Sequence, residues 1–211
     1  MPVESNLLKG YHAAIDLAAE RLAASDPVVI ARRSQSTYST GSSQLRLMYL
    51  GHAYTIDWPS GRVCKEGTDE DAPVTTSVLL LNYILSAHRQ MPTGEFIAYR
   101  DIPGAATYEP SFLKRSVNPL VKTFGGDPAL LCAAGETLDA SEAAVGDTGI
   151  TINVLPLLPV TYAIWHGDDE FPPSGVILFD ASARRLLSAE CLIVAASNGV
   201  YALMNAARSL K

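Results

Sequence analysis

The sequence predicts an α+β fold, a single globular domain over residues 1–211 with a helix at each end. Short strands, mostly antiparallel or mixed, are expected to pack against the helices. Apolar residues recur at steps of three and four near both termini, as they do on one face of a helix. Short alternating runs between them come in tightly turned groups, without the regular strand–helix–strand order of a doubly wound sheet. No internal repeat, charge block or long linker divides the chain.

The first part of the chain is expected to hold a helix, a hairpin and a buried helix. Apolar residues over 7–22 follow helical spacing, and Asp26-Pro27 ends that pattern. Residues 32–43 are rich in Ser, Thr and Gly, which predicts a loop or an irregular strand. Alternating runs on either side of Gly51-His52 predict a hairpin. Residues 75–88 are apolar almost all round, which predicts a buried helix at the centre of the core.

The second part is expected to alternate between strands and helices. The expected segments are a strand over 96–100, helices over 109–124 and 128–138, a loop over 139–149, strands over 150–154, 160–165 and 176–179, and a helix over 188–210. Asn118-Pro119 should start, kink or break the first of these helices, because proline lacks the N–H that a helix interior uses. In the last helix, Gly199 is small enough to let another element approach closely.

The composition excludes several classes of protein. Of the 211 residues, 48% are apolar and 18% are charged, which is typical of a folded core. There are 16 basic and 22 acidic side chains, for a net charge of −6. This balance offers no basic field for a phosphate backbone or an anionic bilayer. We therefore expect neither a nucleic-acid partner nor a membrane partner.

The cysteines and the N-terminal residues predict a cytoplasmic protein. Cys64, Cys132 and Cys191 are far apart and form no C-x-x-C motif, which predicts free thiols in a reducing compartment. Residues 1–25 lack the unbroken apolar run of a signal peptide. The sequence also lacks the G-x-S-x-G, P-loop and dinucleotide motifs. It therefore identifies no catalytic residue and no cofactor.

The densest polar cluster, residues 165–173, follows a predicted strand. His166, Asp168, Asp169 and Glu170 are candidate metal ligands, because carboxylates beside a histidine can hold a hard cation or a transition metal. The alternative is a solvated turn whose carboxylates accept hydrogen bonds from backbone N–H groups. Asp180, at the end of the next predicted strand, has the same two interpretations.

Candidate ligand contacts come from this cluster and from earlier turns. They are Tyr99, Arg100, Tyr108, Trp165, Asp168, Glu170 and Asp180. The aromatic side chains among them are expected in exposed turns, where they could line a pocket. The Arg100 guanidinium could clamp an anionic ligand or pair with the acidic cluster, and a structural ion pair is the alternative.

Several of these residues belong to a longer pattern. It comprises Leu80–Leu85, Gly94-Glu95, Tyr99-Arg100, Gly104, Tyr108, Phe112, Phe124-Gly125, Trp165, residues 167–172 and Leu178-Phe179-Asp180. In this order and spacing the residues resemble the bacterial and archaeal domain-of-unknown-function family 3786, over nearly the whole chain. The Trp-x-Gly-Asp-x-Glu-Phe-Pro segment followed by Leu-Phe-Asp is the most specific part. Tyr99 departs from the pattern, in which Phe is usual, and so does Cys191.

The resemblance implies a metabolic context but no activity, because the family has no activity assigned. Some relatives carry a Cys-rich, cluster-binding segment that these 211 residues do not include, and this implies a link to metal or corrinoid metabolism in anaerobes. We therefore expect a soluble, non-catalytic protein that binds a small molecule, a cofactor or a protein partner. One alternative is an enzyme of unknown reaction that uses the acidic cluster as metal ligands or as a general acid and base. Another is a structural interaction subunit, with a second copy of the chain as a candidate partner.

Overall fold

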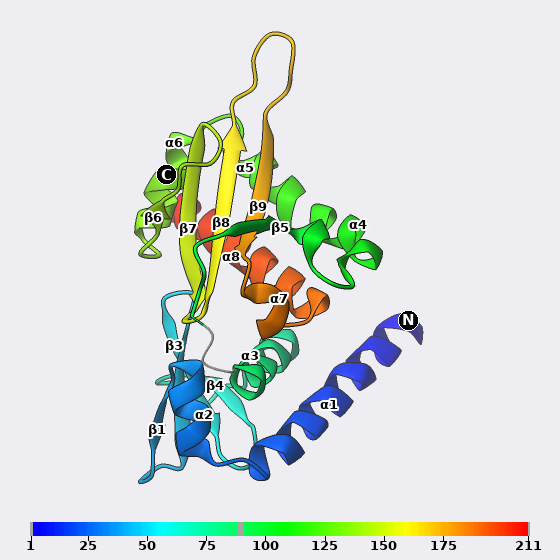
Figure 1. Cartoon of the computed structure of the whole chain (residues 1–211), viewed down its shortest axis with the longest axis vertical. Helices are drawn as coiled ribbons and strands as arrows, with labels where there is room; N and C mark the ends of the chain where they lie inside the picture. The colour runs from blue at the N-terminus through cyan, green and yellow to red at the C-terminus, as the bar shows by residue number, and fades with distance from the viewer. Residues whose placement is uncertain (1, 88–90, 211) are drawn as a thin grey trace. The chain divides into compact units, whose positions relative to one another are not determined.

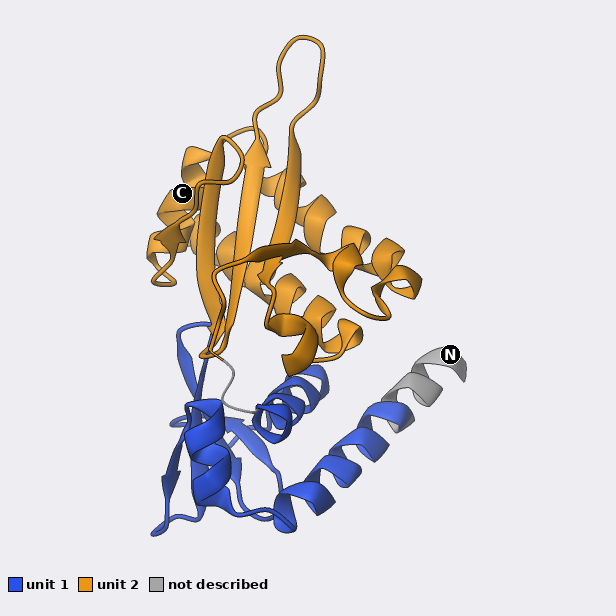
Figure 2. Ribbon diagram, viewed as in Figure 1, with its two compact units in different colours: residues 1–90 blue, residues 91–211 orange. Residues whose placement is uncertain are grey.

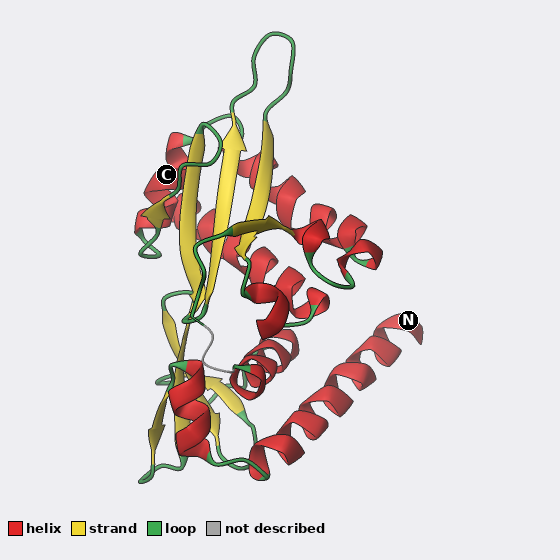
Figure 3. Cartoon of the chain, viewed as in Figure 1, coloured by secondary structure: helices red, strands yellow, loops and turns green. Residues whose placement is uncertain are grey.

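The computed structural model describes residues 2–87 and 91–210, with side chains from residue 10 onward. Helices and two antiparallel sheets confirm the α+β class and the two terminal helices (Figure 3). The chain forms two compact units, residues 1–90 and 91–211 (Figure 2). The single domain expected over 1–211 stays a prediction.

Unit 1 contains three helices and a four-stranded sheet among its described residues (Figure 1). The elements are α1 (Pro2–Ala23), α2 (Pro27–Ser34), β1 (Thr37–Ser39), β2 (Gln44–Tyr49), β3 (His52–Asp57), β4 (Val63–Lys65) and α3 (Val74–Ser86). The strands follow the order β1-β2-β3-β4 and are antiparallel. Leu50 and Gly51 both have positive φ between β2 and β3, as type I′ turns require, so the expected hairpin is confirmed.

Helix α2 was not expected from the sequence, and it corrects the loop or strand predicted from residue 32. The Asp26 carboxylate accepts hydrogen bonds from the Val28 and Val29 N–H groups, at 2.8 and 3.4 Å, and so caps the new helix. Pro27 occupies its first turn, where no N–H is needed. Asp26-Pro27 therefore ends α1, as expected, and also starts α2.

The core of unit 1 is formed by apolar residues of its helices and strands, including Leu22, Leu45, Leu47, Ile56, Leu79, Leu80, Leu81, Tyr83 and Ile84. The buried Tyr83 hydroxyl donates to the Ser34 carbonyl at 2.8 Å, which joins α3 to the end of α2. Helix α3 confirms the predicted buried helix through residue 86, whereas residue 88 lies outside the described residues. It belongs to the core of unit 1, and unit 2 has a core of its own.

Unit 2 contains a five-stranded sheet with helices on one face (Figure 1). Its elements are β5 (Phe96–Ala98), η1 (Tyr99–Asp101), η2 (Ala105–Thr107), α4 (Glu109–Phe112), η3 (Leu113–Val117), α5 (Asn118–Phe124), α6 (Ala129–Glu136), β6 (Ser141–Glu142), β7 (Thr148–Leu155), β8 (Leu158–Trp165), β9 (Ser174–Asp180), α7 (Ala183–Leu186) and α8 (Ala189–Ser209). The strand order is β5-β9-β8-β7-β6, and all pairs are antiparallel.

Two prolines in unit 2 are accommodated by local irregularity. Pro119 follows η3, a π-helical stretch in which the Asn118 N–H bonds to the Leu113 carbonyl, so the helical path continues past the proline. The predicted strands over 150–154 and 160–165 leave Pro159 in the turn between them. Instead it lies inside β8, opposite Asn153, beside a register shift in β7. Prolines within sheets occur at such irregularities because they cannot donate to the ladder.

The covered face of the sheet packs tightly against α8. The Tyr162 hydroxyl of β8 donates to the Ala196 carbonyl of α8 at 3.3 Å. A Cβ atom added at Gly199 would overlap that hydroxyl, so this position requires glycine. The close approach expected at Gly199 is confirmed.

Candidate functional site

Tyr99 is a core residue of unit 2, not an exposed aromatic. Its side chain is 2% exposed and stacks on Phe112, with ring centroids 4.2 Å apart and planes 14° apart. Its hydroxyl donates to the Ala189 carbonyl of α8 at 3.0 Å. Burial, with smaller contributions from Tyr108 and Glu190, raises the pKa of Tyr99 to about 12. The expectation of an exposed turn is wrong here, because the tertiary contacts of η1 bury the ring.

Asp180 holds the segment that precedes β5. Its carboxylate accepts hydrogen bonds from the backbone N–H groups of Thr93 at 3.0 Å, Gly94 at 2.6 Å and Ser182 at 2.8 Å. The Thr93 hydroxyl lies 3.1 Å from both carboxylate oxygens. The family pattern includes both Gly94 and Asp180, and the fold brings them into direct contact. The predicted capping role of Asp180 is confirmed.

The ionised form of Asp180 is favoured although the side chain is only 3% exposed. Burial raises the pKa of the carboxyl, but the hydrogen bonds from Ser182, Thr93 and Gly94 together outweigh burial and hold the pKa below its ordinary value. The described residues place no Lys, Arg or His in an ion pair with Asp180. A buried negative charge is thus stabilised there by neutral donors.

Residues 166–173, which follow Trp165 at the end of β8, form the long loop between β8 and β9 (Figure 1). The Asp168 carboxylate accepts from the N–H groups of Glu170 at 2.9 Å and Phe171 at 2.7 Å, and these bonds lower its pKa. The Asp168 N–H in turn donates to the Phe171 carbonyl at 2.9 Å. The alternative of a solvated turn capped by its own carboxylate is therefore confirmed for Asp168.

The candidate metal ligands make separate contacts. His166 Nδ1 lies 3.3 Å from a carboxylate oxygen of Asp147, which also accepts the His166 backbone N–H at 2.8 Å. Asp169 and Glu170 are exposed. Over residues 2–87 and 91–210, no group of three or more His, Cys, Asp and Glu side chains is arranged to hold a metal ion. The metal assignment of His166, Asp168, Asp169 and Glu170 stays a prediction.

The other candidate contacts lie at the surface. Arg100, Tyr108 and Trp165 are exposed. In the described part of the chain, none of the ion pairs involves Arg100, so the structural pair expected for it is not formed there. The clamp on an anionic ligand stays a prediction. None of these three side chains lines the hollow of unit 2 that Asp180 lines, which is described next.

A hollow of about 350 Å³ lies on the other face of the unit 2 sheet. Its lining consists of Pro92, Gly94, Phe96, Ser141, Glu142, Ala143, Ala144, Thr151, Pro159 and Asp180, so every strand of the sheet contributes. Side chains alternate along a strand. Ile150 and Tyr162 point to α6 and α8, so Thr151 and its partner Thr161 point away from these helices.

Asp180 is the one predicted site residue in this hollow. Phe96, Glu142 and Thr151 were missed, because the chain brings residues 92–96, 141–144 and 180 together only through the register of five strands. The family pattern could have indicated part of the hollow, because it includes both Gly94 and Asp180. An exposed aromatic side chain was expected to line a pocket. The aromatic side chain that lines this hollow is Phe96, which is 51% exposed, and not Tyr99.

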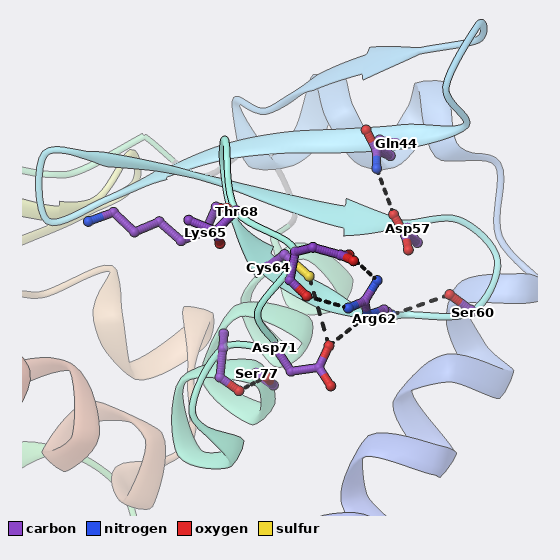
Figure 4. A network of polar contacts seen from close by, with 11 residues as sticks. Gln44, Asp57, Ser60, Arg62, Cys64, Lys65, Thr68, Asp71 and Ser77 are labelled. Atoms are coloured by element: carbon purple, nitrogen blue, oxygen red, sulfur yellow. Dashed lines mark hydrogen bonds and ion pairs between the residues drawn. The ribbon is translucent and has the colours of Figure 1, made fainter.

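Unit 1 has a polar network around β4 and the segment that follows it (Figure 4). Arg62 Nε lies 2.6 Å from Asp71 Oδ1, and its Nη1 lies 3.0 Å from Asp69 Oδ1. Arg46 binds Glu66 at 2.6 Å, and both Arg46 and Arg62 have raised pKa values because of their carboxylate partners. Cys64 Sγ lies 3.9 Å from Asp71 Oδ1, and burial raises the pKa of this thiol. The network closes the segment 66–71 onto β4.

A second hollow in unit 1, of about 210 Å³, is lined by Ser25, Asp26, Val29, Ile30, Arg33, Ile84, Leu85 and Ala87. Its carboxylate belongs to Asp26, which already caps α2. Ligand pockets usually measure about 300–1,000 Å³, so this hollow is smaller than most of them. The hollow of unit 2 is the better candidate.

The fold and the hollow define an α+β chain with an open sheet face that Asp180 and Phe96 line. The model of the family described as "Domain of unknown function (DUF3786)" matches residues 26–202. The chain belongs to this family, and the resemblance seen in the sequence is confirmed. Neither the search of curated proteins nor the search of solved structures gave a match. None of the described helices combines the length and apolar character that a membrane crossing requires.

Proposed function

We propose that this chain is a non-catalytic binding protein that takes a small molecule in the hollow of unit 2. The observation that carries the proposal is the hollow itself, about 350 Å³ in volume, with Phe96 of one edge strand and residues 141–144 of the other edge among its lining. This volume lies at the small end of the range for ligand pockets. A few polar groups on an otherwise apolar lining of Pro, Ala and Phe are the usual composition of such a site.

The state of the polar groups favours binding over catalysis. The Asp168 and Asp180 carboxylates already accept several backbone hydrogen bonds, and both have lowered pKa values, which disfavours a general-acid role near neutral pH. Burial raises the pKa of all three cysteine thiols, so none is activated as a thiolate. The three thiols are free, which supports the proposed cytoplasmic location.

The link to metal or corrinoid metabolism in anaerobes remains part of the proposal, with the family resemblance as its support. The hollow is smaller than a corrin macrocycle would need. Within that metabolism, we therefore expect a small metabolite in the hollow rather than an intact corrinoid.

The test is a screen of small neutral and charged fragments by NMR, with the binding position read from the amide shifts of the whole chain. We expect some fragments to shift residues 93–96 and 141–144. The variant Ala144→Trp fills the hollow from an exposed position and should abolish those shifts. The control Ala106→Trp adds the same ring at an exposed position of η2 that does not line the hollow. A screen in which no fragment shifts the hollow residues overturns the proposal.

A role in protein contacts is a second proposal, which the loop after β8 favours. Phe171 is 67% exposed and is followed by Pro172 and Pro173. An exposed aromatic side chain at a loop tip is a common anchor in interfaces. The candidate partner is a second copy of the chain. Solution mass measured over a concentration series tests it, and a monomer at every concentration would argue against it.

A further inference from the structure

One side of the unit 2 hollow carries a row of hydroxyl groups. Ser141 of β6 pairs with Thr151 of β7, and Thr151 pairs with Thr161 of β8, so the three side chains lie at the same level of neighbouring strands. Side chains of directly paired residues lie on the same face of a sheet. Ser141 and Thr151 line the hollow, and Thr161 is 2% exposed. This side of the hollow therefore presents hydroxyl groups to a ligand.

The Thr151 and Thr161 hydroxyls form a hydrogen bond of 2.7 Å, in which either oxygen could be the donor by distance. Burial decides the direction. Among the described residues, the buried Thr161 hydroxyl has no hydrogen-bond partner except Thr151. If Thr161 only accepted, its own proton would be buried without a partner, which is costly. Thr161 therefore donates to Thr151, and the proton of the Thr151 hydroxyl is left for a group in the hollow.

The charged groups near the hollow disfavour ions of either sign. Its described lining includes no Lys, Arg or His, and the buried Asp180 carboxylate would repel an anion. A cation would find no free carboxylate oxygen on Asp180, because both oxygens already accept backbone hydrogen bonds. Glu142 pairs with Ile150, which points to α6, so the Glu142 carboxylate lies on the helix-covered face. The hollow therefore suits a neutral molecule.

The hollow also has apolar surface for the carbon body of such a molecule. Pro159 lies on β8, the strand beside Thr151, and it lines the hollow. Phe96 lies on the edge strand β5 with its side chain 51% exposed, and Pro92 lines the hollow near it. Apolar surface thus extends from the hydroxyl groups toward the β5 edge.

We propose that the hollow binds a neutral molecule with a hydrogen-bond acceptor such as a carbonyl oxygen. The acceptor receives the hydrogen bond of the Thr151 hydroxyl, and the carbon body lies against Pro159 and toward Phe96. This inference rests on the proposed function, because it names the ligand class of the same site. It predicts that affinity depends on the acceptor and falls when the ligand carries a negative charge, at nearly constant shape.

The experiment uses three probes of nearly the same shape: acetophenone, ethylbenzene and benzoate. Each is titrated into the whole chain, and NMR amide shifts give the site and the dissociation constant. We expect acetophenone to bind at residues 141–144 and 151 about fivefold more tightly than ethylbenzene, which has no acceptor. Benzoate should bind more weakly than acetophenone, because Asp180 repels it. Binding of benzoate as tight as that of acetophenone would overturn the inference.

Two matched variants test the assigned donor. Thr151→Val removes the hydroxyl at nearly constant shape, so it should weaken acetophenone about fivefold and leave ethylbenzene unchanged. Thr161→Val breaks the same bond between the two side chains but keeps the Thr151 hydroxyl in the hollow, so the preference for acetophenone should remain. Equal losses in the two variants would show that the Thr151 hydroxyl is not the donor to the ligand, and would overturn the inference.

The wild-type titrations separate this inference from the proposed function. If acetophenone and ethylbenzene bind equally in the hollow, the inference of an acceptor fails while the proposed function stands. If no probe and no screened fragment shifts the hollow residues, both fail.

Discussion

The two sheets expose polar residues in different ways. On unit 1, the carboxylates Glu66, Asp69 and Asp71 are each matched by a guanidinium of the same unit. On unit 2, the buried carboxylate of Asp180 borders a hollow, and it is stabilised by backbone N–H groups instead of a guanidinium. A paired set of charges closes a segment onto its own sheet. The carboxylate held by backbone donors on unit 2 leaves a hollow beside it, and this difference is why we propose the function on unit 2.

Asp180 has a large structural role in unit 2, and its removal should have the largest effect on stability. Asp180→Ala removes the acceptor of three backbone N–H groups at a buried position. We expect a loss of about 1–3 kcal/mol in the free energy of unfolding, because donors left without partners keep their desolvation cost. Urea denaturation measures it. Asp180→Asn, which retains an oxygen acceptor, should lose less. A variant as stable as the wild type would show that the segment before β5 does not depend on this carboxylate.

Lowering the pH should have a smaller effect on the free energy of unfolding, through protonation of Asp180. The pKa of Asp180 is lower in the folded chain than its ordinary value of about 3.9, so the unfolded chain takes up the proton first. The stabilisation is complete above the ordinary pKa and is lost as the pH falls through the folded pKa. The stability difference between wild type and Asp180→Ala should therefore shrink below about pH 4. Urea midpoints between about pH 7 and pH 3 test this, and a constant difference would contradict it.

The smallest expected effect lies in the paired network of unit 1. Arg62→Ala removes the cation that holds Asp69 and Asp71 in an exposed network. We expect only a slight fall in the urea midpoint, smaller than that of Asp180→Ala and smaller again in high salt, because exposed pairs are screened. The variant also leaves two carboxylates without their guanidinium. A fall in the urea midpoint as large as that of Asp180→Ala would contradict this expectation.

Local patterns predicted much of the fold. Helical spacing predicted α1 and α8, alternation predicted the hairpin of β2 and β3, and the small Gly199 indicated a close approach. Helix α2 was missed because the same Asp26-Pro27 pair that ends one helix caps the next. This double role is recognised only from the structure, in which the Asp26 carboxylate accepts hydrogen bonds from the N–H groups of Val28 and Val29.

The site was less predictable, because it depends on contacts between distant residues. Asp180 could be selected from its place at a strand end, yet Thr93 and Gly94 reach it across more than 80 positions of sequence. Tyr99 follows a strand and precedes a turn, which by itself indicates exposure. Its burial comes from stacking on Phe112 and bonding to Ala189, and neither contact leaves a local pattern.

The contact between Tyr162 and Gly199 also restricts how unit 2 can move. A one-residue shift or a rotation of α8 would bring a residue with a Cβ atom under the Tyr162 ring, since both neighbours of Gly199, Asn198 and Val200, carry one. The helix is therefore fixed in one register against the sheet. If the hollow adapts its width to a ligand, the adjustment must come from its rims, residues 92–96 and 141–144, while the layer beneath them serves as a rigid base.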